Sequence, residues 1–218
     1  CQMSSERFSL VDERWILCLL SDGSTAEFSL REVFERAPEI REVVGDIPTQ
    51  SFAILRLLLS IAHRAVEGPA DEYDWNDLWQ VGAVPHEPVT AYLDRYRERF
   101  DIFGPTPFLQ TPGLHTARNE VAGLEKLLAD VPTGHPFFTT RIGRGIERLS
   151  YAEAARWLVH LQAFDPSGIK SGAVGDERVK GGKGYPIGTG WAGNLGGLYV
   201  EGSNLGETVL LNLIPLDQ

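Results

Sequence analysis

The stretch Ile47–Ala65 reads IPTQSFAILRLLLSIAHRA and is the most apolar helical segment of the 218-residue chain. A proline followed by a threonine is typical of a helix start, so a helix is predicted over Gln50–Val66 with Thr49 as its cap. Apolar side chains recur at the spacing of one helix face, at Ala53, Leu57, Leu58, Ile61 and Ala65. Leu55 and Leu59 widen this stripe, and the segment is therefore predicted to be the core helix around which the chain packs.

The segments before this helix predict a β-hairpin and a short capped helix. Arg14–Leu20 and Thr25–Phe28 have strand character, and Asp22-Gly23 between them is a hairpin-turn dipeptide. Ser29–Glu32 (SLRE) matches the capping box, in which the serine hydroxyl and the glutamate carboxylate satisfy free amides of a helix start. This helix is expected to end near Arg36, because the following Pro38 disfavours helical geometry at Ala37.

Downstream, the pattern predicts further helices and two late strands. Asp71–Trp79 is read as a loop or short helix packed by its aromatic rings, and a helix is expected from Pro88 to Phe100. Further helices are predicted around Leu124–Leu128 and, behind a second capping box at Ser150–Glu153, as far as Phe164; strands are predicted at Tyr199–Glu201 and Thr208–Ile214. The fold class is α+β: one domain over residues 1–218, with an N-terminal β-hairpin, several helices and a glycine-rich loop region followed by strands.

That glycine-rich region, Gly168–Gly206, holds thirteen of the twenty-three glycines. Glycine on this scale forfeits core packing, so it is expected where a backbone approaches a ligand closely or where a loop moves. Between Gly168 and Gly184 the local charge is +2, although the whole chain carries −10. A cationic glycine-rich loop on an acidic protein suggests a contact surface for a phosphate-bearing polymer, and the alternative is a disordered surface loop.

Composition and motifs exclude several other classes of function. The net charge of −10 argues against indiscriminate nucleic-acid binding. Two cysteines give no disulfide framework and suit a reducing cytoplasm. No apolar run approaches the length of a membrane span. Gly188–Gly193 satisfies G-x-G-x-x-G, but glycines follow where the helix of a dinucleotide site should begin. No histidine has metal-ligand spacing, so no cofactor, metal or reaction is predicted.

A second segment with binding character runs from His135 to Gly145, reading HPFFTTRIGRG. Aromatic rings can stack on unpaired bases, while arginines hold phosphates and hydroxyls donate hydrogen bonds. One of Phe137 and Phe138 is expected to pack into the core, and which of the two is the contact residue stays open.

Four motifs in order resemble the large subunit of the type I-E CRISPR surveillance complex (Cascade), the CasA family. They are FSLVDERWI (Phe8–Ile16), the core-helix stretch quoted above, TPFLQTPGL (Thr106–Leu114) and GSNLGETVLLNLIPL (Gly202–Leu216). The resemblance implies a non-catalytic, cytoplasmic subunit that recognises the protospacer-adjacent motif of double-stranded DNA. Its implied partners are the other Cascade subunits, the CRISPR guide RNA, the target duplex and the helicase–nuclease, with no membrane.

The resemblance also implies where the contacts lie. The family's glycine loop, which approaches the motif from the minor groove, falls on Gly181, Gly182, Lys183 and Gly184, with Lys180 beside it. Its aromatic-led loop, which reaches the 5′ handle of the guide RNA, falls on Phe138, Thr139, Thr140, Arg141 and Arg144. Family members are longer, so the chain is expected to be an amino-terminal portion that lacks their C-terminal helical bundle. The competing hypotheses are a nucleotide- or phosphate-binding enzyme that uses the glycine-rich loop as a phosphate cradle, and a purely structural assembly protein.

Overall fold

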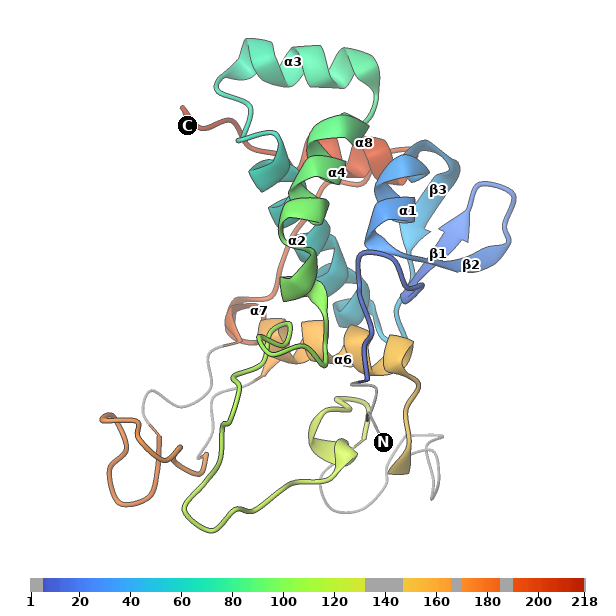
Figure 1. Ribbon diagram of the computed structural model, residues 1–218. Helices are drawn as coiled ribbons and strands as arrows, with labels where there is room; N and C mark the ends of the chain where they lie inside the picture. The colour runs from blue at the N-terminus through green and yellow to red at the C-terminus, as the bar shows by residue number, and fades with distance from the viewer. Residues whose placement is uncertain (1–5, 132–146, 166–169, 185–189, 218) are drawn as a thin grey trace.

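The core of the protein is a long central helix with a small sheet on one side and further helices around it (Figure 1). The computed structural model describes residues 6–131, 147–165, 170–184 and 190–217. The central helix, α2 (Pro48–Ala65), has α4 (His86–Arg95) and α6 (Tyr151–Phe164) packed against it. Within the described ranges, no helix is long and apolar enough to cross a membrane.

Helix α2 confirms the predicted core helix and corrects two details of it. The helix begins at Pro48, earlier than expected, because proline fits the first helical position, where its missing N–H costs nothing. Thr49 is therefore inside the helix, and Ile47 occupies the capping position without a side-chain hydrogen bond. The buried side chains of α2 are Gln50, Ala53, Ile54, Leu55, Leu58, Ile61 and Ala62. The predicted stripe missed Gln50, Ile54 and Ala62 because α2 is covered on more than one side, by α4, α6, α8 and β3. Three of its predicted members are only half-buried: Leu57, Leu59 and Ala65.

The predicted hairpin is present as β1 (Ile16–Leu20) and β2 (Thr25–Phe28), which pair antiparallel. Gly23 in its turn has a φ of +83°, a conformation that favours glycine. A third strand, β3 (Ile40–Val43), pairs antiparallel with the other edge of β1 and gives the order β2-β1-β3. The side chains buried on this sheet come from Ile16, Cys18, Phe28, Ile40 and Val43.

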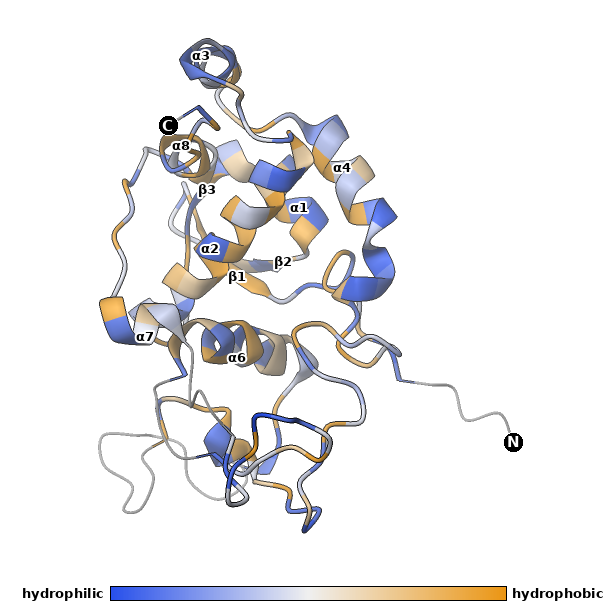
Figure 2. Cartoon of the chain, turned by 90° about the vertical axis from the view of Figure 1, so that its left-hand side faces the viewer, coloured by the Kyte–Doolittle hydropathy of each residue, from blue (hydrophilic) through white to orange (hydrophobic). Residues whose placement is uncertain are grey.

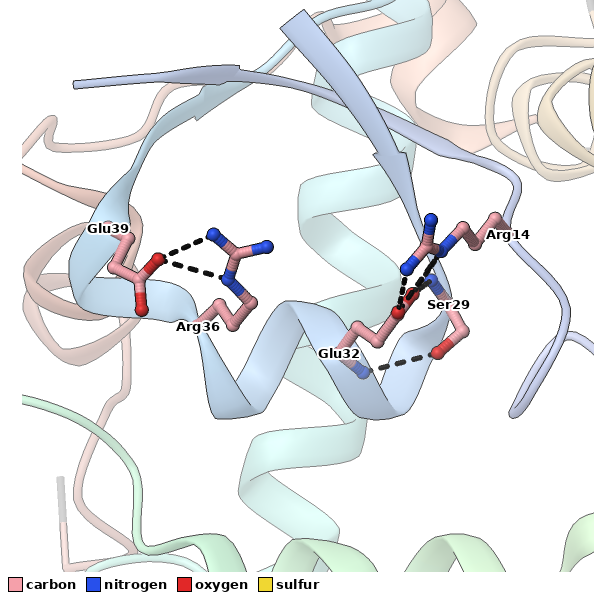
Figure 3. Close-up of polar contacts among 5 residues, drawn as sticks. All are labelled: Arg14, Ser29, Glu32, Arg36 and Glu39. Carbon is pink, nitrogen blue, oxygen red and sulfur yellow. Dashed lines mark hydrogen bonds and ion pairs between the residues drawn. The ribbon is translucent and has the colours of Figure 1, made fainter. Parts of the chain in front are cut away.

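The first capping box also forms as predicted (Figure 3). The amide of Glu32 donates to the Ser29 hydroxyl at 3.2 Å, and the amide of Ser29 donates to the Glu32 carboxylate at 2.9 Å. The same carboxylate accepts from the Arg14 guanidinium at 2.6 Å. Helix α1 (Leu30–Glu35) ends at the expected place, and a 3₁₀ turn, η1 (Ala37–Glu39), leads into β3.

Two further helices follow the prediction with small changes. Asp71–Trp79 is a helix rather than a loop, α3 (Glu72–Val81), and the rings of Trp75 and Trp79 stack with centroids 5.5 Å apart. The helix expected up to Phe100 divides into α4 and the 3₁₀ turn η2 (Arg97–Phe100).

Near Leu124 only a 3₁₀ turn forms, η3 (Leu124–Lys126). Helix α6 begins at the predicted cap, where the Ser150 hydroxyl accepts from the Glu153 amide at 3.1 Å, and it ends at Phe164 as expected.

The two predicted late strands are wrong. Residues 199–201 belong to no strand, and the segment predicted as Thr208–Ile214 is mostly helical, in α8 (Leu205–Leu211). The reason is a capping signal: Asn204 Oδ1 accepts from the Glu207 amide at 3.0 Å and starts the helix. The glycine-rich region, Gly168–Gly206, thus contains a short helix, α7 (Trp191–Leu195), and an irregular segment, and α8 rather than a strand begins at its end. The α+β class, with its N-terminal hairpin and small antiparallel sheet, is confirmed.

Candidate nucleic-acid interface

The glycine loop contains a tight reverse turn at Lys180–Lys183. The amide of Lys180 donates to the carbonyl of Lys183 at 2.9 Å, and the Lys183 amide donates back to Lys180 at 3.1 Å. Between them, Gly181 and Gly182 both have positive φ, at +59° and +74°. Two successive residues with positive φ are the requirement of a type I′ hairpin turn, which explains why two glycines stand together here.

The two turn glycines have no packing role. A Cβ atom added to either Gly181 or Gly182 would meet no heavy atom within 4 Å, and the same holds for Gly184. Within the described part of the chain, the amides of Gly181 and Gly182 donate no hydrogen bond. The turn therefore presents bare backbone and two free N–H donors to its surroundings.

Gly172 holds this turn in place through a backbone hydrogen bond. It is buried, and its amide donates to the Gly182 carbonyl at 2.8 Å. A Cβ atom on Gly172 would lie 2.5 Å and 2.7 Å from the two γ-carbons of Val179, so only glycine allows this close approach. Gly172 was not singled out from the sequence, where it is one glycine among many.

A second turn, Thr116–Asn119, lies against the glycine loop. Thr116 and Ala173 form a β-bridge, and the Val174 amide donates to the His115 carbonyl at 3.0 Å. The Asn119 amide donates to the Thr116 carbonyl at 3.0 Å, and Asn119 has a φ of +53°. This turn was not predicted from the sequence, although Asn is a residue type that tolerates this conformation well.

The two turns line one open hollow of about 660 Å³. The residues that line it come from two segments, 170–176, 179 and 181–183 of the glycine loop and 116–118 and 120 of the second turn. In both ribbon views these loops lie at the end of the molecule beyond α6, away from α3 (Figures 1 and 2).

Ion pairs divide the cations of the loop into two groups. Arg178 is held by Asp176, with both guanidinium-to-carboxylate hydrogen bonds at 2.9 Å, and Lys170 Nζ lies 2.9 Å from Asp165. The Arg178 guanidinium lowers the pKa of the Asp176 carboxyl below its ordinary value. Among the described residues, Lys180 and Lys183 have no ion pair and both are exposed. The free positive charge therefore flanks the two bare glycines.

The structure describes only one of the two predicted contact regions. It brings Lys180, Gly181, Gly182, Lys183 and Gly184 together in one turn. The aromatic-led loop, with Phe138, Thr139, Thr140, Arg141 and Arg144, lies outside the described residues.

Comparison with known proteins identifies the family. The model of the CRISPR-associated protein Cse1 family matches residues 9–218. The chain belongs to the Cse1 family. This confirms the resemblance drawn from the four motifs, since a curated relative from Thermus thermophilus is described as CRISPR-associated protein CasA/Cse1.

Several members of the Cse1 family are similar over nearly the whole chain. The Thermus thermophilus protein is 35% identical over 217 residues, which cover 97% of this chain and 40% of that protein. Thermobifida fusca Cse1, known from a crystal structure, is 54% identical in sequence and superposes with a TM-score of 0.88. The match covers 97% of this chain and 40% of the Thermobifida fusca chain. A chain of a CRISPR RNA-guided surveillance complex has the same fold, with a TM-score of 0.74, 24% identity and coverage of 95% and 43%. This chain thus spans about two fifths of the length of the relatives it matches.

Proposed function

We propose that this chain is the part of a Cascade large subunit that meets the target duplex, and that its glycine turn recognises the protospacer-adjacent motif from the minor groove. The observation that carries the proposal is the pair Gly181-Gly182, which has free amides, positive φ and open space where side chains would be. Membership of the Cse1 family supports a role in a CRISPR complex, because that family is CRISPR-associated.

The shape of the turn suits the minor groove. That groove is only about 6 Å wide in B-DNA, so a backbone without side chains enters it more easily than a bulky residue. The base edges there are mainly acceptors, at adenine N3 and thymine O2, which match peptide N–H donors. Readout by a backbone amide is degenerate, and it would permit several related motifs.

The lysines beside the glycine turn hold the protein in position on the DNA and do not read its base sequence. Lys180 and Lys183 carry exposed charges with no ion pair among the described residues. Phosphates line both sides of the groove, so each ammonium group can hold one, and this adds salt-dependent affinity. The net charge of −10 on the whole chain then discourages binding to DNA elsewhere on the surface.

The remaining parts of the proposal concern partners. Phe138, Thr139, Thr140, Arg141 and Arg144 contact the 5′ handle of the guide RNA, and the protein assembles with other Cascade subunits in the cytoplasm. It performs no catalysis and helps to recruit the helicase–nuclease. These assignments are supported by the four family motifs and by the aromatic and cationic residue types in the segment.

The test of motif recognition is Gly182→Asp in a reconstituted complex whose large subunit carries this chain in a family-length polypeptide. Aspartate adds bulk and negative charge to a turn that must lie between phosphates, so we expect a strong loss of motif-dependent duplex binding. The matched control is Gly23→Asp, because Gly23 also has positive φ and open space but lies in the β1–β2 hairpin. The control should bind like the wild type.

Equal binding of the motif-bearing duplex by the wild type and by Gly182→Asp would contradict the proposal. A nucleotide added without DNA provides a separate arm. Saturable binding of the nucleotide that Gly182→Asp abolishes would favour the phosphate-cradle enzyme instead.

The guide contact is tested by Phe138→Ala. We expect this change to leave the unfolding temperature of the chain nearly unaltered and to weaken association with the guide-bearing complex. A large loss of stability with normal assembly would make Phe138 a core residue and transfer the contact to Phe137 or Arg141.

A further inference from the structure

The turn at Thr116–Asn119 holds an arginine at the rim of the hollow that the glycine turn also lines. Arg118 is the third residue of this turn, and the side chain is 83% exposed. The turn is fixed from two sides, by the bridge from Thr116 to Ala173 and by the Glu120 amide, which donates to the Thr116 hydroxyl at 3.2 Å. The position of Arg118 relative to the glycine loop is therefore set by backbone contacts.

Arg118 is available in a way that Arg178 is not. Its nearest acidic group is the Glu120 carboxylate, 3.7 Å from Nη1, which is longer than a hydrogen bond. Arg178, by contrast, makes two 2.9 Å hydrogen bonds to Asp176. An exposed pair at 3.7 Å contributes little free energy, so Arg118 can leave Glu120 for a stronger acceptor.

We propose that Arg118, on the second turn that lines the hollow, is a second phosphate contact, so that Arg118 and Lys183 hold the two DNA backbones that border one minor groove. This inference rests on the proposed function, because it takes the glycine turn to be the element that enters the groove. It adds a positioning residue that neither the four motifs nor the glycine pattern indicated.

The geometry of a minor groove calls for such a pair. Two phosphate backbones border the groove, and a turn inserted between them leaves one backbone on each side. Lys183 lies at the end of the inserted turn, and Arg118 lies on the separate turn Thr116–Asn119 that lines the same hollow. A guanidinium group can hold a phosphate through two parallel hydrogen bonds, which fixes orientation as well as adding charge.

The experiment measures duplex affinity over a salt series, in the same reconstituted complex, with matched and mismatched motifs. Arg118→Ala should make the negative slope of log K against log salt shallower by about one. It should also weaken the binding of the matched and the mismatched duplex by the same factor. The control is Arg64→Ala, which removes the same charge from an exposed arginine in the last turn of α2, outside the residues that line the hollow. Arg64→Ala should leave the slope unchanged.

Two further variants keep the test independent of folding. Arg118→Lys retains a cation and should retain the slope, with a modest loss of affinity from the missing second hydrogen bond. Glu120→Gln removes the competing carboxylate and should strengthen binding of both duplexes. Thermal unfolding of each variant checks that the chain still folds.

Failure of this inference is distinct from failure of the proposed function. If Gly182→Asp abolishes motif-dependent binding while Arg118→Ala matches the Arg64→Ala control, the inference is overturned and motif recognition stands. Loss of affinity for the matched duplex alone in Arg118→Ala would also overturn it, because a phosphate contact does not discriminate between motifs. If Gly182→Asp has no effect, the proposed function is overturned, and the inference that rests on it is overturned with it.

Discussion

The side-chain oxygen of Thr49 lies 3.0 Å from Nε2 of His160, and this contact joins the first turn of α2 to the buried face of α6. His160 is only 4% exposed, and its ring stacks on Phe164 with centroids 5.0 Å apart. An imidazole in these surroundings is held neutral, because burial lowers the pKa of His160 below its ordinary value.

This buried imidazole predicts a loss of stability in acid. The unfolded chain binds a proton on His160 near its ordinary pKa of about 6.5, whereas the folded protein binds it only at lower pH. The stabilisation is therefore complete above about pH 6.5 and declines as the pH falls from there toward the folded-state pKa. Denaturant unfolding of the wild type and of His160→Gln should show a difference in free energy that shrinks as the pH is lowered. A difference that stays constant over that range would contradict the prediction.

The core position of Leu58 predicts a large effect of truncation. Its side chain is fully buried in α2, so Leu58→Ala removes apolar contacts and leaves a cavity. We expect the free energy of unfolding to fall by about 2–5 kcal/mol. Arg56→Ala, on an exposed position of the same helix, should change it by less than about 0.5 kcal/mol. Equal effects of the two changes in thermal or denaturant unfolding would mean that Leu58 does not face the core.

The ion pair between Arg156 and Glu27 should contribute more than the one between Arg36 and Glu39. Arg156 is 8% exposed, and its Nη1 donates to Glu27 at 2.7 Å and to the Trp15 carbonyl at 2.8 Å. Glu27→Gln leaves a buried guanidinium without its counter-charge, and we expect a loss of about 1–3 kcal/mol.

The matched control is Glu39→Gln, because the Arg36–Glu39 pair is exposed on both sides (Figure 3). Its effect should stay below about 1 kcal/mol. Denaturant unfolding at neutral pH compares the two, and a larger effect of Glu39→Gln would reverse the ranking.

Local signals explain which parts of the fold were predictable. The hairpin turn at Asp22-Gly23 and the capping box at Ser29 depend on residues within a few positions of each other, and both formed as expected. The cap of α2 was misplaced although Pro48, which fits the first helical position, is a local signal that puts Thr49 inside the helix. The contact of the Thr49 hydroxyl with His160, more than a hundred residues away, is not contained in any local pattern.

The candidate site divides in the same way. The family resemblance placed the contact at Gly181–Gly184, and the structure adds that Gly181 and Gly182 have positive φ, which explains the two glycines. The second turn, Thr116–Asn119, could not be placed beside them, because it reaches the glycine loop through the non-local bridge between Thr116 and Ala173. The net charge of the loop, +2 from its sequence, did not show which cation pairs with which acid, and the structure pairs Arg178 with Asp176.

Helix α8 gives the last prediction, at the place where the strand assignment was wrong. Val209 and Leu210, from the apolar run that suggested a strand, are buried in this helix together with Leu205. Asn204 starts this helix by accepting the Glu207 amide at 3.0 Å, and the Ser203 amide donates to the Glu207 carboxylate at 2.8 Å. Asn204→Ala should therefore cost about 1 kcal/mol of stability, and Asn204→Asp should retain most of it.

The matched control for Asn204 is Asn194→Ala, on the exposed surface of α7. It removes the same side chain without removing a cap, and we expect no measurable change in the free energy of unfolding. Denaturant unfolding compares the three variants. If Asn204→Ala is as neutral as Asn194→Ala, packing of the apolar face alone determines the helix, and the cap only marks where it begins.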